Sequence, residues 1–175
     1  AAAWWSGDPS RDLGIVGITG TDGKTTTSFL AVAALEAAGV STGLIGTVET
    51  RVGEVRERHE AHVTTPAAPE LQATLRAMAV NGNAAAVLET TSHALELERV
   101  LGIAYDAAIF TNLTHEHLDL HGTFDRYRAA KLRLFEALAG SPENPAKTVA
   151  GRAWPKLAIL NRDDGAAPWF EAAAR

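Results

Sequence analysis

The sequence contains no cysteine, which excludes disulfide bonds and every zinc site that depends on thiolate ligands. It has no apolar run near the roughly 20 residues of a membrane-spanning helix, and its start shows no basic-then-apolar signal pattern. Basic residues are in the minority, with 16 Lys and Arg against 21 Asp and Glu and a net charge of -5. We therefore expect a cytoplasmic protein that binds neither nucleic acid nor a membrane.

The length and composition predict one globular domain with a hydrophobic core. The chain has 175 residues, of which 46% are hydrophobic, enough for a single domain to bury a core. We expect this domain to cover residues 13–175. Residues 1–12 are expected to be the tail of another domain or a linker, because Trp4 and Trp5 precede a Gly-Asp-Pro-Ser turn signal. A frayed terminus is the alternative.

The most informative stretch is residues 14–27, G-I-V-G-I-T-G-T-D-G-K-T-T-T. Its apolar residues predict a buried strand, its glycines a turn, and the alanine-rich sequence that follows a helix. This order is typical of phosphate-binding loops of the form G-x-x-x-x-G-K-[ST], although Ile18 replaces the first glycine. The alternative is an ordinary glycine-rich turn between a strand and a helix.

Each part of this loop suits phosphate chemistry. Gly20 and Gly23 allow backbone conformations that turn N–H groups toward phosphate oxygens, and the helix that follows points its positive end at the same place. Lys24 adds a full positive charge, and the Thr25 hydroxyl can ligate Mg²⁺. The residues expected to bind nucleotide phosphate are Gly20, Thr21, Asp22, Gly23, Lys24, Thr25 and Thr26.

Strand and helix patterns alternate along the chain and predict an α/β fold with a three-layer, P-loop-type, mostly parallel sheet flanked by helices. We expect a small β-hairpin excursion around residues 44–62, with the charged run 54–60 as its solvated tip. The expected strands are residues 15–18, 44–48, 49–55, 84–88, 106–111 and 157–160, with Gly53 in a turn. Those at 15–18, 84–88, 106–111 and 157–160 are expected to be buried. The expected helices are residues 26–38, 68–81 and 124–139, with a loop over 141–155 and a short final helix.

Polar residues follow the predicted core strands. Glu89 ends the strand 84–88, and a carboxylate at the carboxyl end of a parallel strand lies at the sheet edge where such folds bind ligands and often a metal. A surface glutamate is the alternative. Thr64 and Thr65 precede a proline. Their two hydroxyls suit a binding site and a helix cap equally well.

The loop 112–121 contains three histidines and an aspartate within seven residues, a composition that favours a metal site. Its H-x-H-x-D pattern resembles that of metallo-β-lactamase-type hydrolases. In that motif a histidine follows the aspartate directly, whereas this sequence has Leu120. That interpretation also leaves the phosphate loop unexplained.

Lys131 lies on the apolar stripe of the predicted helix 124–139. A buried, unpaired ammonium costs several kcal/mol, so the lysine must extend its charge to solvent, pair with another group, or be chemically modified. The residues alone leave these three alternatives open.

Four separated segments together resemble the Mur ligase family. They are G-I-T-G-T-D-G-K-T-T-T at 17–27, T-T-P at 64–66, L-E-T-T-S-H-A-L at 88–95, and F-T-N-L-T-H-E-H-L-D-L-H-G with Y-R-A-A-K-L-R-L-F within 110–135. They span most of the chain in the family's order. The second and third segments resemble the tripeptide-forming branch.

The resemblance implies an ATP-dependent ligase that adds an amino acid to a UDP-MurNAc-dipeptide through an acyl phosphate during peptidoglycan synthesis. It implies Mg²⁺ ligation by Thr25 and Glu89, a second Mg²⁺ held by Glu89 and His117, and a carbamate formed from CO₂ on Lys131. Lys24, Glu89, His117 and Lys131 are then the catalytic residues. The residues expected to hold the UDP-muramoyl-peptide are Thr64, Thr65, Thr91 and Arg99.

The resemblance covers only the family's middle, ATP-binding domain and implies separate N-terminal and C-terminal domains. The sequence ends early even within that domain, so we expect this chain alone not to be a competent ligase. The sequence departs from the family pattern at Asp22, Leu97 and Thr91, where asparagine, glutamine and serine are expected. The alternatives are a nucleotide-binding regulatory module that does not ligate, or a sister ligase of the folylpolyglutamate type. A Mur-like amidotransferase partner with a four-cysteine zinc insert is excluded as well, because this sequence contains no cysteine.

Overall fold

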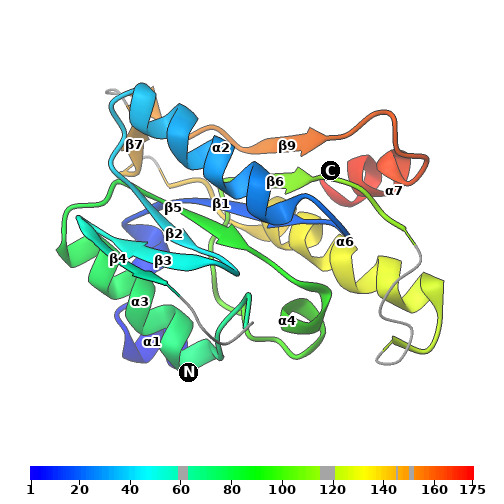
Figure 1. Cartoon of the computed structure of the whole chain (residues 1–175), viewed down its shortest axis with the longest axis horizontal. Helices are drawn as coiled ribbons and strands as arrows, with labels where there is room; N and C mark the ends of the chain where they lie inside the picture. The colour runs from blue at the N-terminus through cyan, green and yellow to red at the C-terminus, as the bar shows by residue number, and fades with distance from the viewer. Residues whose placement is uncertain (59–62, 115–120, 145, 150–151) are drawn as a thin grey trace.

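The structure, a computed structural model of the chain, describes residues 1–58, 63–114, 121–144, 146–149 and 152–175. Within them one sheet has the strand order β4-β3-β2-β5-β1-β6-β9 (Figure 1). Its strands are β1 Gly14–Thr19, β2 Thr42–Ile45, β3 Glu49–Val52, β4 Val55–Arg58, β5 Ala85–Glu89, β6 Ala107–Phe110 and β9 Leu157–Leu160. The helices are α1 Ala2–Trp5, α2 Lys24–Ala37, α3 Ala68–Val80, α4 Ser92–Glu96, α6 Phe124–Gly140 and α7 Ala167–Ala173, with a 3₁₀ turn Pro9–Arg11.

The five strands β2, β5, β1, β6 and β9 run parallel, and β3 and β4 add an antiparallel hairpin at one side. Every residue of β1 and of β5 is buried, as expected for parallel strands covered on both faces. The predicted mostly parallel sheet is confirmed. Its parallel strands bring their carboxyl ends to a common edge, where ligands bind in such folds.

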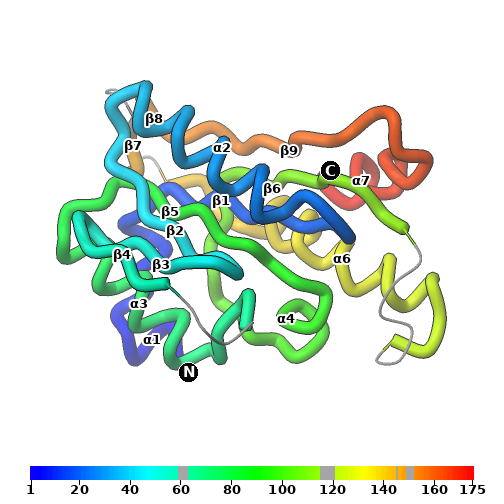
Figure 2. Tube along the Cα trace, in the orientation of Figure 1, coloured from blue at the N-terminus to red at the C-terminus, as the bar shows by residue number. Residues whose placement is uncertain are grey.

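Helices cover both faces of this sheet and complete the three predicted layers. On one face, Val16 and Val87 pack with Val32 of α2. On the other, Ile15 and Leu88 belong to a larger cluster to which α3, α4, α6 and α7 contribute. Figure 2 shows α2 crossing in front of the strands and α6 passing behind them.

None of the helices that the structure describes is long and apolar enough to cross a membrane.

The hairpin differs from the prediction in its boundaries. The strand predicted over 49–55 ends at Val52. The predicted turn at Gly53 is confirmed, since Gly53 takes a positive φ of 55° and Val52 pairs with Val55. The charged run is therefore not the tip, since part of it forms β4. The side chains of β4 are exposed, and charged residues on an edge strand discourage pairing with other chains.

Two further predictions fail near the C-terminus. Strand β9 was expected to be buried, but Leu157 and Ile159 are 46% and 48% exposed because β9 lies at the sheet's edge beside β6. The predicted loop 141–155 contains a small antiparallel pair, β7 Thr148–Val149 and β8 Arg152–Ala153.

The first residues are ordered against α3, which contradicts the frayed-terminus alternative. Ala3 of α1 is buried, and the Arg76 guanidinium donates from Nε to the Ser6 carbonyl at 2.7 Å and from Nη2 to the Gly7 carbonyl. Trp4 and Trp5 remain exposed. The assignment of residues 1–12 to another domain or a linker stays a prediction.

A buried ion pair ties the segment after α6 to the sheet. Asp106 Oδ2 accepts from the Ile15 N–H at 2.8 Å and from Lys147 Nζ at 2.7 Å, and Lys156 Nζ lies 3.5 Å from Oδ1. The side chains of Asp106 and Lys147 are each 2% exposed. Burial lowers the pKa of Lys147, and Asp106 offsets part of that effect. Asp106 therefore joins β1, β6 and this segment.

We predict that Asp106→Ala lowers the free energy of unfolding by about 3–5 kcal/mol, because it leaves the Lys147 ammonium buried without its carboxylate. Lys147→Met costs less, since Asp106 keeps its contacts with the Ile15 N–H and Lys156. Urea unfolding followed by circular dichroism measures both. Asp125→Ala, which removes an exposed ion pair with Arg128, is the control with little effect. Equal losses for Asp106→Ala and Lys147→Met would contradict this asymmetry.

Candidate active site

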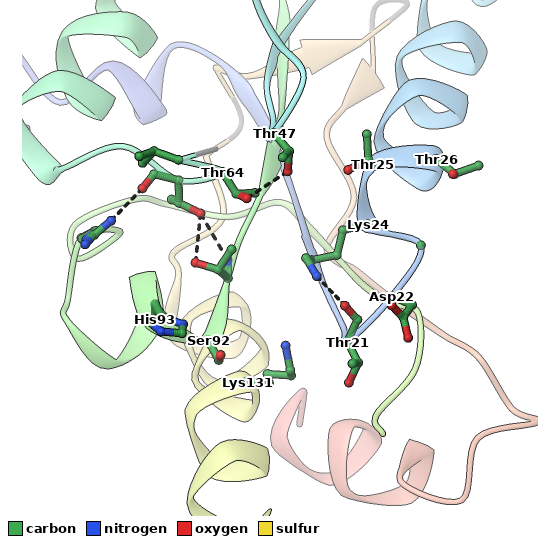
Figure 3. Close-up of a pocket in the computed structure, with 15 residues that line it drawn as sticks. Thr21, Asp22, Lys24, Thr25, Thr26, Thr47, Thr64, Ser92, His93 and Lys131 are labelled. Carbon is green, nitrogen blue, oxygen red and sulfur yellow. Dashed lines mark hydrogen bonds between the residues drawn. The ribbon is translucent and has the colours of Figure 1, made fainter. Parts of the chain in front are cut away.

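A cavity of about 540 Å³ opens at the carboxyl edge of the parallel strands (Figure 3). Side chains from the loop after β1, the turn after β2, the segment before α3, the region around α4, and α6 meet there. Its lining residues are Thr21, Asp22, Gly23, Lys24, Thr25, Thr26, Thr47, Val63, Thr64, Thr65, Thr91, Ser92, His93, Arg99 and Lys131. The cavity therefore collects residues that lie far apart in the sequence.

We call residues 20–26 the phosphate-type loop, and its residues 21–26 line one wall of the cavity. Helix α2 begins at Lys24, after Gly23 with a positive φ of 75°, so the first-turn N–H groups lack intrahelical partners and are suited to an anion. Lys24 Nζ donates to the carbonyls of Gly20 at 3.0 Å and Thr21 at 2.7 Å. At Gly20 a Cβ would stand 1.8 Å from Thr111 Oγ1. Only glycine fits at this point of the loop.

The end of β6 holds the loop in place. Asn112 accepts from the Thr21 N–H through its carbonyl at 2.9 Å and from the Asp22 N–H through Oδ1 at 2.8 Å. The Thr111 hydroxyl donates to the Asp22 carbonyl at 2.7 Å. The Asp22 side chain is exposed, so the structure fixes its main chain and leaves its carboxylate at the surface.

Glu89 lies at the end of β5, fully buried, and its carboxylate is surrounded by donors. Oε2 lies 3.0 Å from the hydroxyls of Thr25 and Thr47. Oε1 lies 3.1 Å from the Ser28 hydroxyl and 3.3 Å from the Thr47 N–H. The surface-glutamate alternative is therefore wrong, and these donors replace the water that a buried carboxylate loses.

The Thr25 hydroxyl and the Glu89 carboxylate fit Mg²⁺ by their chemistry. Both are hard oxygen ligands beside the phosphate-type loop, and Mg²⁺ is usually held by one or two carboxylates together with substrate phosphates. Among the described residues no group of three or more His, Cys, Asp or Glu could hold a metal.

The predicted ligand His117 lies outside the described residues, as do His115 and Asp119 of the H-x-H-x-D pattern. His121, at the end of that loop, is buried, and its Nε2 is hydrogen-bonded to the Ser92 hydroxyl at 3.1 Å. Its ring also lies beside Tyr127, with 5.3 Å between the centroids. These contacts place His121 in the packing between α4 and α6.

Lys131 of α6 faces the cavity from below the phosphate-type loop (Figure 3). It is 1% exposed, which contradicts extension of its charge to solvent. Nζ donates to the Gly20 carbonyl at 2.7 Å and lies 4.6 Å from the centre of the Tyr127 ring. Of the three alternatives, the structure thus supports the one in which Lys131 pairs with another group. It places the Lys131 amine at the cavity wall.

The residues expected to bind a sugar-peptide gather at the opposite side of the cavity. The Thr65 hydroxyl donates to the Glu89 carbonyl at 2.8 Å and lies 3.3 Å from the Thr91 hydroxyl. Thr91 also caps α4, and Arg99 Nη1 donates to the Thr65 carbonyl at 3.0 Å. The polar side chains of this wall are therefore held by one hydrogen-bonded network. The helix-cap alternative for Thr64 and Thr65 is not observed, because α3 begins with Ala67 as its N-cap and has no side-chain cap bond.

Sequence reasoning missed Ser28, Thr47 and Asn112. Thr47 was placed inside a strand predicted to reach residue 48, whereas β2 ends at Ile45. Both Thr47 and Asn112 lie just after parallel strands, at the edge where ligands bind, and that position was the available signal. Ser28 follows Thr25 by three residues on the same helix face.

Nearly the whole of this chain aligns with similar proteins. It is 50% identical over 165 residues to a UDP-N-acetylmuramyl-tripeptide synthetase of Roseiflexus sp. (strain RS-1), a match covering 93% of the chain and 32% of that protein. It is 45% identical over 164 residues to a UDP-N-acetylmuramoyl-L-alanyl-D-glutamate--2,6-diaminopimelate ligase of Bacillus licheniformis, covering 94% and 32% respectively. The chain spans about a third of the length of these relatives.

Solved structures share the fold. A structure of a UDP-N-acetylmuramoyl-L-alanyl-D-glutamate--2,6-diaminopimelate ligase superposes with a TM-score of 0.78 at 29% identity, covering 99% of this chain and 32% of that one. A Mycobacterium tuberculosis folylpolyglutamate synthase complexed with ADP and AMPPCP has a TM-score of 0.60 at 16% identity, covering 99% and 42%, a likeness of fold alone. The family model for the Mur ligase middle domain matches residues 18–174. The chain belongs to the Mur ligase family, of which it carries the middle domain.

Proposed function

We propose that this chain is the ATP-binding catalytic domain of a ligase that adds an amino acid to a UDP-MurNAc-dipeptide in peptidoglycan synthesis. One observation carries the proposal: a single cavity joins the phosphate-type loop, the Thr25–Glu89 pair and the polar wall of Thr64, Thr65, Thr91 and Arg99. Phosphoryl transfer to a bound substrate needs a nucleotide site and an acceptor site side by side.

In the proposed reaction, a substrate carboxylate oxygen attacks the γ-phosphorus of ATP and ADP leaves, which forms an acyl phosphate. The amine of the incoming amino acid then attacks the acyl carbon, phosphate leaves, and the amine gives up a proton. Lys24 and the N–H groups at the start of α2 offset charge on the phosphoryl oxygens. Catalysis in such a site is mainly positioning and electrostatic stabilisation.

The Thr25 hydroxyl and the Glu89 carboxylate would hold Mg²⁺, which neutralises phosphate charge when it is bound. His117 is proposed as a further ligand together with Glu89. On the opposite wall, the hydroxyls of Thr64, Thr65 and Thr91 and the Arg99 guanidinium would bind and orient the UDP-muramoyl-peptide.

Lys131 is proposed to carry a carbamate. The ammonium first loses a proton. The neutral amine then attacks CO₂, a nitrogen–carbon bond forms while one C=O bond becomes C–O⁻, and a second proton is released, so that a cation becomes an anion. The amine is buried 2.7 Å from the Gly20 carbonyl at the cavity wall, where an anion close to Lys24 and Mg²⁺ is favourable. Residues Thr25, Glu89, His117 and Lys131 would then form the metal site.

The relatives are about three times longer than this chain, so the proposed parent protein has further domains that bring the UDP moiety and the amino acid. This chain alone is then not a competent ligase. The proposed compartment is the cytoplasm. A folylpolyglutamate-type ligase shares the fold at 16% identity, whereas the identities of 50% and 45% to tripeptide-forming enzymes favour the peptidoglycan reaction.

We predict that the chain binds the non-hydrolysable ATP analogue AMPPNP with Mg²⁺, and that Lys24→Ala weakens this binding by about tenfold or more, because a charge-assisted phosphate contact is lost. Isothermal titration calorimetry measures both. The control is Arg152→Ala, which removes a cation on β8 away from the cavity. Absence of binding, or equal affinity after Lys24→Ala, would contradict the nucleotide site.

We also predict that ¹³C-labelled bicarbonate gives a protein-bound carbamate signal in ¹³C NMR, which Lys131→Ala abolishes. The matched control is Lys147→Met, because Lys147 is a second buried lysine whose loss leaves Lys131 in place. A spectrum without a bound signal, in excess bicarbonate and Mg²⁺, would contradict carbamylation and favour a nucleotide-binding module that does not ligate.

A further inference from the structure

Thr47 contacts both sides of the cavity. It belongs to the turn between β2 and β3, outside the phosphate-type loop and outside the segment 63–66. Its N–H donates to Glu89 Oε1 at 3.3 Å, and its hydroxyl lies 3.0 Å from Glu89 Oε2 and 2.9 Å from the Thr64 hydroxyl. Figure 3 shows the Thr47 and Thr64 side chains facing each other at the cavity wall.

The single hydroxyl proton of Thr47 sets the direction of this chain of contacts. An ionised carboxylate accepts hydrogen bonds and cannot donate them. The Thr47 hydroxyl donates toward both Glu89 Oε2 and the Thr64 hydroxyl, so its one proton is shared between the two contacts. The position of the Thr64 hydroxyl then depends on Thr47, which in turn depends on Glu89.

The backbone of this turn is built against the same carboxylate. Gly46 is buried, and a Cβ at this position would stand 2.4 Å from Glu89 Oε1. The absence of a side chain at Gly46 thus lets the turn approach closely enough for both Thr47 contacts. The turn is thus a second element that holds Glu89, besides α2, whose Thr25 and Ser28 also reach the carboxylate.

A bound cation makes Thr47 more important. The Thr25 hydroxyl donates its one proton to Glu89, and as a ligand it would also offer a lone pair to the metal. Thr25 would then move with the metal, so the other donors are needed to hold the carboxylate in one orientation. Of these, Ser28 shares its one hydroxyl proton with the Thr25 carbonyl, 2.8 Å away. Thr47 shares its hydroxyl proton with Thr64 in the same way, but its N–H donates to Glu89 as well.

We propose that Thr47 is a positioning residue that fixes the Glu89 carboxylate for Mg²⁺ and links it to Thr64, so that the metal side and the acceptor side of the cavity are held as one unit. This inference rests on the proposed function. Residues that orient a metal ligand typically change metal affinity by about 10–100-fold when they are removed.

The first test measures the affinity of the full 175-residue chain for Mn²⁺, as a probe for Mg²⁺, in the presence of AMPPNP. Electron paramagnetic resonance reports free Mn²⁺ directly. We expect Thr47→Val to weaken Mn²⁺ binding by about tenfold or more, and Thr47→Ser to restore it because the hydroxyl returns. The matched control is Thr74→Val, the same change at an α3 residue whose hydroxyl donates to the Glu70 main-chain carbonyl, and it is expected to leave Mn²⁺ binding unchanged.

A second variant disturbs the carboxylate from the other direction. Gly46→Ala adds a methyl group against Glu89 Oε1 and is expected to weaken Mn²⁺ binding to a similar extent. Urea unfolding of each variant separates this effect from loss of the fold. Weakened Mn²⁺ binding in a variant as stable as the unchanged chain supports the proposal.

A double-mutant cycle tests the link to Thr64. Thr64→Val is expected to weaken Mn²⁺ binding by about two- to threefold when Thr47 is present and to have no effect in the Thr47→Val background, as for residues in one network. Independent, additive effects would overturn the link. If the unchanged chain binds no Mn²⁺ with AMPPNP, the proposed function fails. If it binds Mn²⁺ and Thr47→Val binds equally well, the function stands and the role of Thr47 is wrong.

Discussion

The hydrogen bonds to the buried carboxylate of Glu89 are the interactions on which the cavity depends. A carboxylate without exposure to solvent is tolerated only when hydrogen bonds replace its hydration. Here the replacement comes from two separate segments, because Thr25 and Ser28 belong to α2 and Thr47 to the turn after β2. The need to satisfy one carboxylate thus draws both segments to the end of β5.

The parallel sheet makes this convergence possible. Its central strands carry apolar residues on both faces, so the polar residues that follow them gather at one edge. Glu89 ends β5, and Thr111 and Asn112 follow β6, where they hold the loop after β1. The opposite edge has a different task, since Asp106 there joins β1, β6 and Lys147 through buried charge. Binding and anchoring are therefore separated by the length of the strands.

Much of this arrangement could be predicted from the sequence because local patterns carry it. The glycines and Lys24 of the phosphate-type loop, and the strand that ends at Glu89, are signals within a few residues of one another. The failures have other causes. The position of β9 at the sheet's edge is decided by strand order, which the local apolar pattern of Leu157 and Ile159 does not contain. Thr47 was not predicted as a site residue because the predicted strand ended three residues later than β2 does. Strand ends are the least reliable part of such predictions.

The hydrogen bonds that Asn112 makes to the loop have a thermodynamic consequence. They fix the Thr21 and Asp22 amides, so the loop takes its shape when the protein folds. Ordering a flexible loop at the moment of binding would subtract its conformational entropy from the affinity. A loop that is already ordered avoids that loss. An incoming anion then meets a preorganised set of N–H donors, and its association requires no slow rearrangement of the backbone.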